Sequence, residues 1–497
     1  MMNRVNRRRF LKGSAAAAAA LAVGRSSGLI AAPTQPVARR DRRPNVVVIL
    51  TDDQRWDCMS CAGHPFLKTP NMDRLAAEGA RFANMFVTTS LCSPSRATCL
   101  SGLYAHTHQV LNNFTDYPAT LPSYPRRLQE SGYETAYIGK WHMNEKSDEK
   151  QPGFDYWASH KGQGTYNDTT FNIEGRREVL KGYYAHRVTE VAVDWLKRPH
   201  QRPFLMIMGH KAPHGPFEPE PKYAAIFDNV KIERPKTAND TGEGKPSWVK
   251  WRVPTWHGID GPLYGLKDYN KFVRGYLGTI CSVDDSVGQI YAALKAIGEL
   301  DNTLFVYISD NGFMIGEHGA IDKRCMYEES IRVPLLVRYP ELIREPRAIS
   351  EMALNLDLAP SVLDICGAKP FDRVHGLSWK NLVSGASKDW RKSWYYEYNY
   401  EREFPYTPNV RGVRTDQWKY IHYPNGDDQP DKYKAELYDV KNDPLETRNL
   451  IDAPECADQV KNLKAELARL MAATDALPDR MPVNPEMKME LPEKSIR

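Results

Sequence analysis

The chain contains four short runs of apolar residues, each followed directly by polar residues. They cover residues 45–50, 135–138, 204–208 and 304–308. Runs of this length and composition are typical of buried parallel strands. Segments with helical periodicity lie between them, at 71–79, 183–197 and 276–298. The alternation predicts an α/β domain with a large, mostly parallel sheet flanked by helices.

The polar residues that follow these runs are the first candidates for a site. They are Thr51-Asp52-Asp53, Gly139-Lys140-Trp141-His142, Gly209-His210 and Ser309-Asp310-Asn311. Ligands of a parallel sheet bind outside the carboxyl ends of its strands, so we expect these residues to converge on one cleft.

Two stretches, 151–182 and 219–269, hold many Gly and Pro residues. They are predicted to be long loops without regular structure that form walls of the site or a surface elaboration. The second loop contains Trp248, Trp251 and Trp256. These tryptophans either contact a sugar ring or are buried core residues of the insertion.

After about residue 385 the pattern changes to strand-like pieces separated by turns, at 394–400, 410–414, 418–423 and 436–440. They predict a small antiparallel sheet, followed by a helix with Leu463, Leu467 and Leu470 on one face. We therefore divide the chain into five parts: a signal peptide (1–32), a linker (33–43), a catalytic domain (44–385), a C-terminal subdomain (386–478) and a tail (479–497).

The first residues have the features of an export signal. Arg7-Arg8-Arg9-Phe10-Leu11-Lys12 precedes an alanine-rich, weakly apolar segment, and this core resembles a twin-arginine signal. We expect a periplasmic or secreted protein with no integral membrane span. The formal net charge of +5 falls to −1 without the six basic residues of this segment, so we expect no nucleic-acid binding.

The eight cysteines do not by themselves predict disulfides, because twin-arginine export carries cargo that has already folded in a reducing compartment. Cys58 and Cys61 have the C-x-x-C spacing of a metal site, but no second pair at zinc-ribbon spacing accompanies them. We interpret both as structural residues, free or bridged to each other after export.

The most specific motif is Leu91-Cys92-Ser93-Pro94-Ser95-Arg96, with Ser101-Gly102 shortly after it. Taken alone, Cys92 is equally well a buried structural thiol. The motif resembles the type I sulfatase signature C-x-P-S-R, and the four polar strand ends, with Ala212-Pro213-His214, occur in that family's order. The resemblance implies an alkaline-phosphatase-like sulfatase fold and hydrolysis of sulfate esters. It also implies that a formylglycine-generating enzyme converts Cys92 to the formylglycine nucleophile.

Asp52, Asp53, Asp310 and Asn311 offer oxygen ligands from two strand ends, a set that suits calcium better than zinc. Adjacent carboxylates at the end of a buried strand repel each other without a cation. The alternative is that Asp52 and Asp53 cap the following helix. The resemblance adds the modified Cys92 as a further metal ligand.

The resemblance also assigns catalytic roles. Arg96, together with calcium, favours the ionised hydroxyl of the formylglycine hydrate. Lys140 and Lys323 hold sulfate oxygens, while His214 or Lys323 protonates the departing alcohol. His142 takes the proton of the second hydroxyl, which expels sulfate. Seen alone, His142 and His214 have the alternative interpretation of buried, hydrogen-bonded histidines. Lys140 and Lys323, seen alone, have the alternative interpretation of surface lysines. We assign no catalytic role to His106, His108, His210 and His318.

Ile321-Asp322-Lys323-Arg324 and Val333-Pro334-Leu335-Leu336-Val337-Arg338 resemble carbohydrate sulfatases, particularly those that act on N-acetylglucosamine 6-sulfate of glycosaminoglycans or mucins. Three alternatives stay open. One is an iduronate 2-sulfatase or another polysaccharide sulfatase. The second is a phosphonate or phosphate-diester hydrolase of the same superfamily, with extra Asp and His ligands for a second metal. The third is a non-catalytic glycan-binding protein. The pattern makes no prediction of the oligomeric state.

Overall fold

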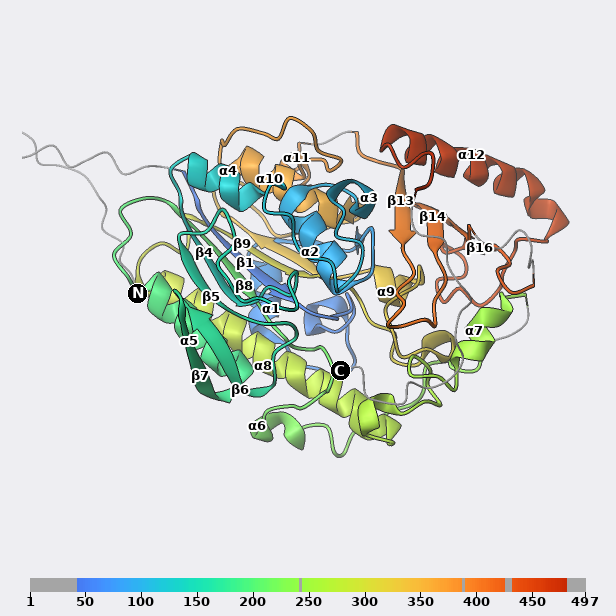
Figure 1. The fold of residues 1–497 in the computed structure, drawn as a ribbon, viewed down its shortest axis with the longest axis horizontal. Coiled ribbons are helices and arrows are strands. Elements are labelled where there is room, and N and C mark those ends of the chain that lie inside the picture. Colours follow the sequence, from blue (N-terminus) through green and yellow to red (C-terminus); the bar gives the residue numbers. More distant parts are fainter. Residues whose placement is uncertain (1–42, 241–243, 387–388, 425–430, 481–497) are drawn as a thin grey trace, which may run out of the picture. The chain divides into compact units, whose positions relative to one another are not determined.

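The computed structural model of the chain describes residues 43–240, 244–386, 389–424 and 431–480 (Figure 1). The predicted signal peptide, almost all of the linker and the tail from residue 481 lie outside these residues, and the domain boundaries stay predictions. Nowhere in the described ranges is there a helix long and apolar enough to cross a membrane.

A mixed, mostly parallel sheet forms the centre of the fold, as predicted. Among the described residues it has ten strands in the order β11-β2-β10-β9-β1-β8-β4-β5-β6-β7. The strands are β1 (Asn45–Thr51), β2 (Ala80–Phe82), β4 (Glu134–Lys140), β5 (Tyr156–His160), β6 (Asn167–Ile173), β7 (Arg176–Tyr183), β8 (Phe204–Gly209), β9 (Thr303–Ser309), β10 (Leu335–Arg338) and β11 (Arg347–Ile349). A separate pair consists of β3 (Met85–Phe86) and β12 (Ala353–Leu354).

The central strands of this sheet, such as β1 and β9, are buried on both faces, which explains the continuous apolar runs in the sequence. Alternate residues of β1 enter two different hydrophobic clusters: Val46 and Val48 enter one, and Val47 and Ile49 enter the other. In Figure 1 the helices α5 and α8 lie on one side of the sheet, and α2, α4 and α10 lie on the other. The predicted α/β layers are confirmed.

The helices in the described residues are α1 (Pro70–Ala77), α2 (Cys92–Ser101), α3 (Ala105–His108), α4 (Tyr124–Glu130), α5 (Tyr184–Leu196), α6 (Pro221–Ala224), α7 (Ser247–Arg252), α8 (Tyr269–Ala296), α9 (Glu328–Ile331), α10 (Leu358–Ile365), α11 (Lys380–Ser384) and α12 (Ala457–Ala473). The three predicted helical segments correspond to α1, α5 and α8. Helix α8 begins seven residues before the predicted start at 276, where Asp268 caps its N-terminus by accepting from the backbone N–H groups of Asn270 and Lys271.

The prediction of an irregular loop at 151–182 is wrong. This stretch contains β5, β6 and the start of β7. Strand β5 pairs in parallel with β4, and β6 and β7 form an antiparallel hairpin at the edge of the sheet. Gly162, Gly164 and Gly175 have positive φ angles, so the glycines that indicated a loop lie at the turns between these strands.

The second predicted loop, 219–269, contains only the short helices α6 and α7 and a 3-10 turn in its described part. Trp248 is fully buried, packs edge-on against Tyr423 and lies under the Arg252 guanidinium. Trp251 packs against the same core, and Trp256 lies beside Tyr264. For Trp248 the core interpretation is therefore confirmed.

The C-terminal part forms a second, antiparallel sheet, as predicted. In the described residues it consists of β13 (Ser393–Tyr398), β14 (Val410–Thr415), β15 (Trp418–His422) and β16 (Glu436–Asp439), in that order. Helix α12 packs on this sheet through the buried Leu463, Leu467 and Met471. The Tyr396 hydroxyl bonds to Ser90, which joins this sheet to the segment just before Cys92.

All eight cysteines are free. Cys58 is buried and Cys61 is half-buried, and no disulfide joins them in the structure. Burial raises the pKa of the Cys58 thiol well above its usual value. A buried, protonated thiol behaves as a small apolar side chain, which agrees with a structural role for Cys58.

Candidate active site

Four neighbouring strands, β9, β1, β8 and β4, bring their carboxyl ends to one edge of the sheet. Asp52 and Asp53 follow β1, Asp310 follows β9, and Lys140 ends β4. All the residues assigned to the site are at most 1% exposed: Asp52, Asp53, Cys92, Arg96, Lys140, His142, His214, Asp310, Asn311 and Lys323. The predicted convergence of the strand ends is therefore present.

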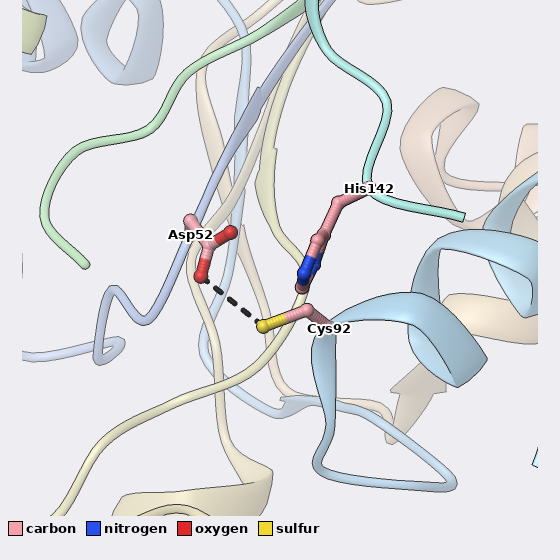
Figure 2. A group of neighbouring side chains, drawn as sticks. All are labelled: Asp52, Cys92 and His142. Atoms are coloured by element: carbon pink, nitrogen blue, oxygen red, sulfur yellow. Dashed lines mark hydrogen bonds between the residues drawn. The ribbon is translucent and has the colours of Figure 1, made fainter. Parts of the chain in front are cut away.

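Cys92 is the first residue of α2, whose N-terminus points at this edge (Figure 2). Its Sγ lies 3.4 Å from Asp52 Oδ1 and 2.9 Å from Lys323 Nζ. Burial, reinforced by Asp52, raises the pKa of the thiol to about 12. An unmodified Cys92 is thus a protonated thiol at neutral pH, which makes it a poor nucleophile.

Asp52 is surrounded by cations. Its Oδ2 lies 3.1 Å from Arg96 Nη2 and forms an ion pair with Lys140, and its Oδ1 lies 3.8 Å from Lys323 Nζ. Burial acts to raise the pKa of Asp52, but Lys140, His214, Lys323 and Arg96 together hold it well below the usual value. Asp52 is therefore ionised at neutral pH.

Asp53, Asp310 and Asn311 form the second half of the acidic edge. Asn311 Nδ2 donates to Asp53 Oδ1 at 2.6 Å, and Asp310 Oδ1 accepts from the Asp53 backbone N–H at 3.2 Å. Asp53 Oδ2 and Asn311 Oδ1 are buried and have no hydrogen-bond partner among the described residues. Asp53 also holds a left-handed backbone conformation with φ of 67°.

This donor set fits a divalent cation with a preference for oxygen. Burial and the neighbouring Asp52 raise the pKa values of Asp53 and Asp310, which shows that the available cationic side chains do not fully compensate their charge. A calcium ion would use the two orphaned oxygens and keep both carboxylates ionised. Asp52, Asp53 and His214 also offer ligand atoms within 4.8 Å of one another.

Arg96 fixes this acidic edge from the helix side. Its Nε donates to Asp310 Oδ2 at 2.7 Å, and its Nη1 donates to the Lys140 carbonyl at 2.7 Å. With the bond to Asp52, one buried guanidinium therefore joins β1, β4 and β9 to α2. Such a fork of fixed donors is the geometry in which arginine binds carboxylates best.

His142 and His214 both lie at this centre. A ring nitrogen of His142 lies within 4.8 Å of Cys92 Sγ and an Asp52 oxygen (Figure 2). His214 Nε2 lies 3.8 Å from Asp53 Oδ2, and its Nδ1 lies 2.7 Å from the Gly215 carbonyl. Burial and Lys140 lower the pKa of His142 well below its usual value, so this imidazole is neutral at neutral pH.

Three further residues contact this centre, and the sequence did not single out two of them, Glu145 and Gln163. Glu145 Oε1 lies 2.9 Å from His142 Nε2, and Gln163 accepts a hydrogen bond from the Lys140 ammonium. Asn113 Oδ1 accepts from the Ser93 backbone N–H at 3.0 Å, in the first turn of α2. Glu145 and Gln163 come from segments outside the strand ends, so the pattern of strands gave no signal for them.

The same three residues line a cavity of about 480 Å³ beside the buried centre. Its wall also includes Phe114 and Phe404, whose rings stack with centroids 6.5 Å apart, and the segment 161–165. Phe114 is 44% exposed, so part of its apolar surface is accessible. A larger cavity of about 920 Å³ is lined by Arg55, Arg332 and others, but by none of the predicted site residues.

The sequence of the chain matches the profiles of known protein families. A profile described as Sulfatase matches residues 44–368, and one described as N-sulphoglucosamine sulphohydrolase, C-terminal, matches residues 316–473. The chain belongs to the sulfatase family. It is therefore a sulfuric ester hydrolase, as the sequence predicted. A twin-arginine signal profile matches residues 4–24, which confirms the predicted export of this sulfatase.

This sulfatase is 34% identical to an N-acetylglucosamine-6-O-sulfatase of Bacteroides thetaiotaomicron, over 87% of each chain. It is also 34% identical to the human N-acetylglucosamine-6-sulfatase, over 73% of this chain and 69% of the relative. A solved structure of a protein in complex with its substrate D-glucosamine-2-N,6-O-disulfate is 33% identical, with a TM-score of 0.80, and the match covers 88% of this chain and 99% of that one.

A phosphonate monoester hydrolase of Agrobacterium radiobacter shares the fold, with a TM-score of 0.72 at 22% identity over 89% of this sulfatase and all of that chain. Together these neighbours confirm the predicted sulfatase fold.

The Asp322 to Arg324 segment of the sulfatase anchors Lys323. Arg324 Nη1 donates to Asp322 Oδ1 at 2.9 Å, its Nε pairs with the buried Glu401, and its guanidinium lies 4.5 Å from the centre of the Phe404 ring. Because Phe404 lines the cavity, this network links the lysine at the reacting centre to the cavity wall.

The four histidines without an assigned role, including His210 that was expected at the cleft, have their partners outside the residues assigned to the site. His106 pairs with Glu397 at 3.0 Å, His108 bonds to Thr98 at 3.0 Å, and His210 bonds to Ser286 at 3.1 Å. His318 stacks on Tyr327 and belongs to a separate buried group with Glu329 and Glu446.

Proposed function

We propose that this sulfatase hydrolyses sulfate esters of carbohydrates, with N-acetylglucosamine 6-sulfate as its substrate. The observation that carries the proposal is the 34% identity, over 87% of both chains, to a relative named for that activity. The relative solved with D-glucosamine-2-N,6-O-disulfate supports a 6-sulfated glucosamine as the recognised sugar. The alternative with iduronate 2-sulfate has no comparable support among these relatives.

Calcium is proposed to be held by Asp52, Asp53, Asp310 and Asn311, with residue 92 as the fifth ligand. The orphaned oxygens of Asp53 and Asn311 support this assignment. Formylglycine at position 92 would supply a hydrated aldehyde with two hydroxyls, one to serve as nucleophile and one to allow release of sulfate. A serine at this position has no second hydroxyl, which supports the proposal of a modified cysteine.

The other side chains act on the substrate and on protons. Lys140 and Lys323 hold sulfate oxygens, and the distance of 2.9 Å from Lys323 Nζ to Cys92 Sγ supports this role because sulfur must come close to residue 92. His214 protonates the leaving oxygen of the sugar, the role that the sequence assigned to it or to Lys323. The neutral His142 accepts a proton from residue 92.

The cavity of about 480 Å³ is proposed to bind the sugar ring. Phe114 and Phe404 offer an apolar wall for the face of a pyranose, while Asn113, Gln163 and Thr165 offer hydrogen bonds for hydroxyl and amide groups. A site that bonds to each polar group of its ligand rejects analogues that leave these groups unpaired. The proposal therefore predicts strong discrimination between sulfate positions.

The geometry gives less support to the two other classes. A phosphate-diester hydrolase with two metals needs further Asp and His ligands. In the described residues the two candidate ligand groups of this centre, Asp52-Cys92-His142 and Asp52-Asp53-His214, contain no carboxylate besides Asp52 and Asp53. A non-catalytic glycan-binding protein has no need for a complete set of acid, base and cations in one buried centre.

Sulfate release from a panel of sugars tests the proposal. The panel contains N-acetylglucosamine 6-sulfate, its 3-sulfate, galactose 6-sulfate, glucosamine-2-N,6-O-disulfate and a 2-sulfated uronate. We expect kcat/KM for N-acetylglucosamine 6-sulfate to exceed that for the 3-sulfate and the uronate by about 10⁴-fold, the range in which unpaired polar groups are rejected. Preference for the uronate would overturn the substrate assignment and leave the sulfatase assignment standing.

A further inference from the structure

Glu145 makes a specific contact with His142, the proposed base of the reaction. Its Oε1 lies 2.9 Å from His142 Nε2. His142 is 1% exposed, and its other nitrogen, Nδ1, has no hydrogen-bond partner in the described part of the chain. An imidazole that donates from Nε2 to a carboxylate carries its hydrogen there and keeps the lone pair of Nδ1 available.

We propose that Glu145 is a positioning residue that holds His142 in the tautomer with hydrogen on Nε2, so that Nδ1 is the basic nitrogen toward residue 92. The inference rests on the proposed function, in which His142 accepts a proton from the modified residue 92. Figure 2 shows the His142 ring next to Cys92 and Asp52.

The main chain at His142 is fixed independently of Glu145. Its φ of 58° lies in the left-handed region, and the Ser93 hydroxyl donates to its carbonyl. The backbone position of the histidine is therefore set by the start of α2. What the backbone does not set is the location of the ring hydrogen, and this is the property that a carboxylate on Nε2 determines.

Gly162 leaves the space that the Glu145 carboxylate occupies. A Cβ atom at position 162 would lie 2.6 Å from Glu145 Oε2, and the φ of +52° at this glycine also disfavours other residues. Glu145, Gly162 and Gln163 all line the proposed sugar cavity. The pair formed by Glu145 and His142 therefore lies where the cavity wall meets the buried centre.

The direct test measures the tautomer without any catalysis. Protein with ¹⁵N-labelled histidine is made as Cys92→Ala, which carries no formylglycine, and the His142 ring is assigned by its loss in a His142→Gln variant. Two-bond ¹H–¹⁵N correlation spectra should show hydrogen on Nε2. Adding Glu145→Gln should produce a mixture or the opposite tautomer, because a glutamine amide donates to Nε2 as readily as it accepts.

Kinetics of the modified enzyme gives the second readout. Glu145→Gln should lower kcat by 10- to 100-fold, the usual effect of removing a partner that orients a functional histidine, with little change in KM. Gly162→Ala should act in the same direction by displacing the carboxylate. The exposed Glu149, which pairs with Arg177, provides the control variant Glu149→Gln with unchanged kcat.

Hydrogen on Nδ1 in the parent protein, or an unchanged Nε2 tautomer in the Glu145→Gln protein, would overturn the proposal. If the tautomer changes as expected and kcat does not, Glu145 still orients His142, and the proton-accepting role of His142 in the proposed function is the part that fails.

Discussion

Lys323 Nζ lies 2.9 Å from Cys92 Sγ, although 231 residues separate the two in the chain. The lysine also forms an ion pair with Asp53, so one ammonium contacts both the proposed nucleophile and a proposed calcium ligand. A cation in this position stabilises negative charge that develops on sulfate oxygens as sulfur approaches residue 92. One lysine side chain therefore contacts both the position of the proposed nucleophile and the proposed calcium site.

Replacing Lys323 should therefore reduce catalysis more than binding. We expect Lys323→Met to lower kcat on an aryl sulfate by about 10²- to 10³-fold, the usual cost of removing one charge-stabilising donor. The exposed Lys236→Met is the matched control and should keep full activity. A Lys323→Met enzyme within threefold of the parent kcat would contradict a role at the reacting centre.

Removal of the proposed calcium should lower both activity and stability. A ligand that binds only the folded state raises the melting temperature, so chelation and Asp53→Ala should each lower it, and calcium should restore it only in the parent. Elemental analysis should find one calcium per chain in the parent and none in Asp53→Ala. Asp372→Ala, in an exposed carboxylate, serves as the control. Stoichiometric zinc in active enzyme would argue against the oxygen-ligand site.

Replacing Glu401 should lower the stability of the protein and also weaken its binding of the sugar substrate. It is fully buried and pairs with Arg324, whose guanidinium supports Phe404. Removing one partner of a buried ion pair leaves an uncompensated charge and costs about 3 kcal/mol. We expect Glu401→Ala to lower the urea midpoint and to raise KM for the sugar substrate, with the exposed Glu403→Ala as control. An unchanged KM would show that the Glu401–Arg324 pair does not affect sugar binding in the cavity.

Asp284 predicts a specific dependence of stability on pH. This carboxylate on α8 accepts from the backbone N–H groups of Asn71 at 3.1 Å and Met72 at 2.8 Å, and burial raises its pKa from 3.8 to about 6. Between these values the folded state holds a proton that the unfolded chain has lost. Its contribution to the free energy of unfolding therefore falls as pH rises through this window, by up to about 3 kcal/mol.

The measurement is urea unfolding at pH 4 and pH 7. Asp284→Asn should remove this part of the pH dependence, while Asn in place of the exposed Asp194 should leave it unchanged. Equal pH dependence in the parent and Asp284→Asn proteins would show that the carboxyl titrates normally in the folded state.

Much of the fold follows from the sequence because β1 and β9 are buried on both faces. Continuous apolar strands that end in Asp52-Asp53 and Asp310-Asn311 predict both the parallel sheet and the edge where these residues meet. The hairpin of β6 and β7 was missed because its strands are mostly polar and exposed at the sheet edge, for example at Arg176 and Glu178. Edge strands of this kind show little apolar pattern.

The sequence predicted those site residues that lie at strand ends or in the motif around Cys92. Glu145 and Gln163 were missed because they come from segments whose position depends on tertiary packing. For Trp248 the sequence left two interpretations open, because an aromatic residue in a loop is available to a ligand only if nothing else covers it. In the structure Tyr423 and Arg252 pack against it. The positions of these loop residues and the burial of Trp248 depend on contacts between distant parts of the chain, which the local sequence pattern does not show.

The chemical state of residue 92 tests the central claim most directly. Mass spectrometry of the peptide that contains Cys92, taken from active enzyme made in its own host, should show that the cysteine sulfur is lost and that an aldehyde or its hydrate has replaced it. Specific activity should rise in proportion to the modified fraction, and Cys92→Ala should be folded and inactive. A wholly unmodified cysteine in fully active enzyme would contradict the formylglycine mechanism.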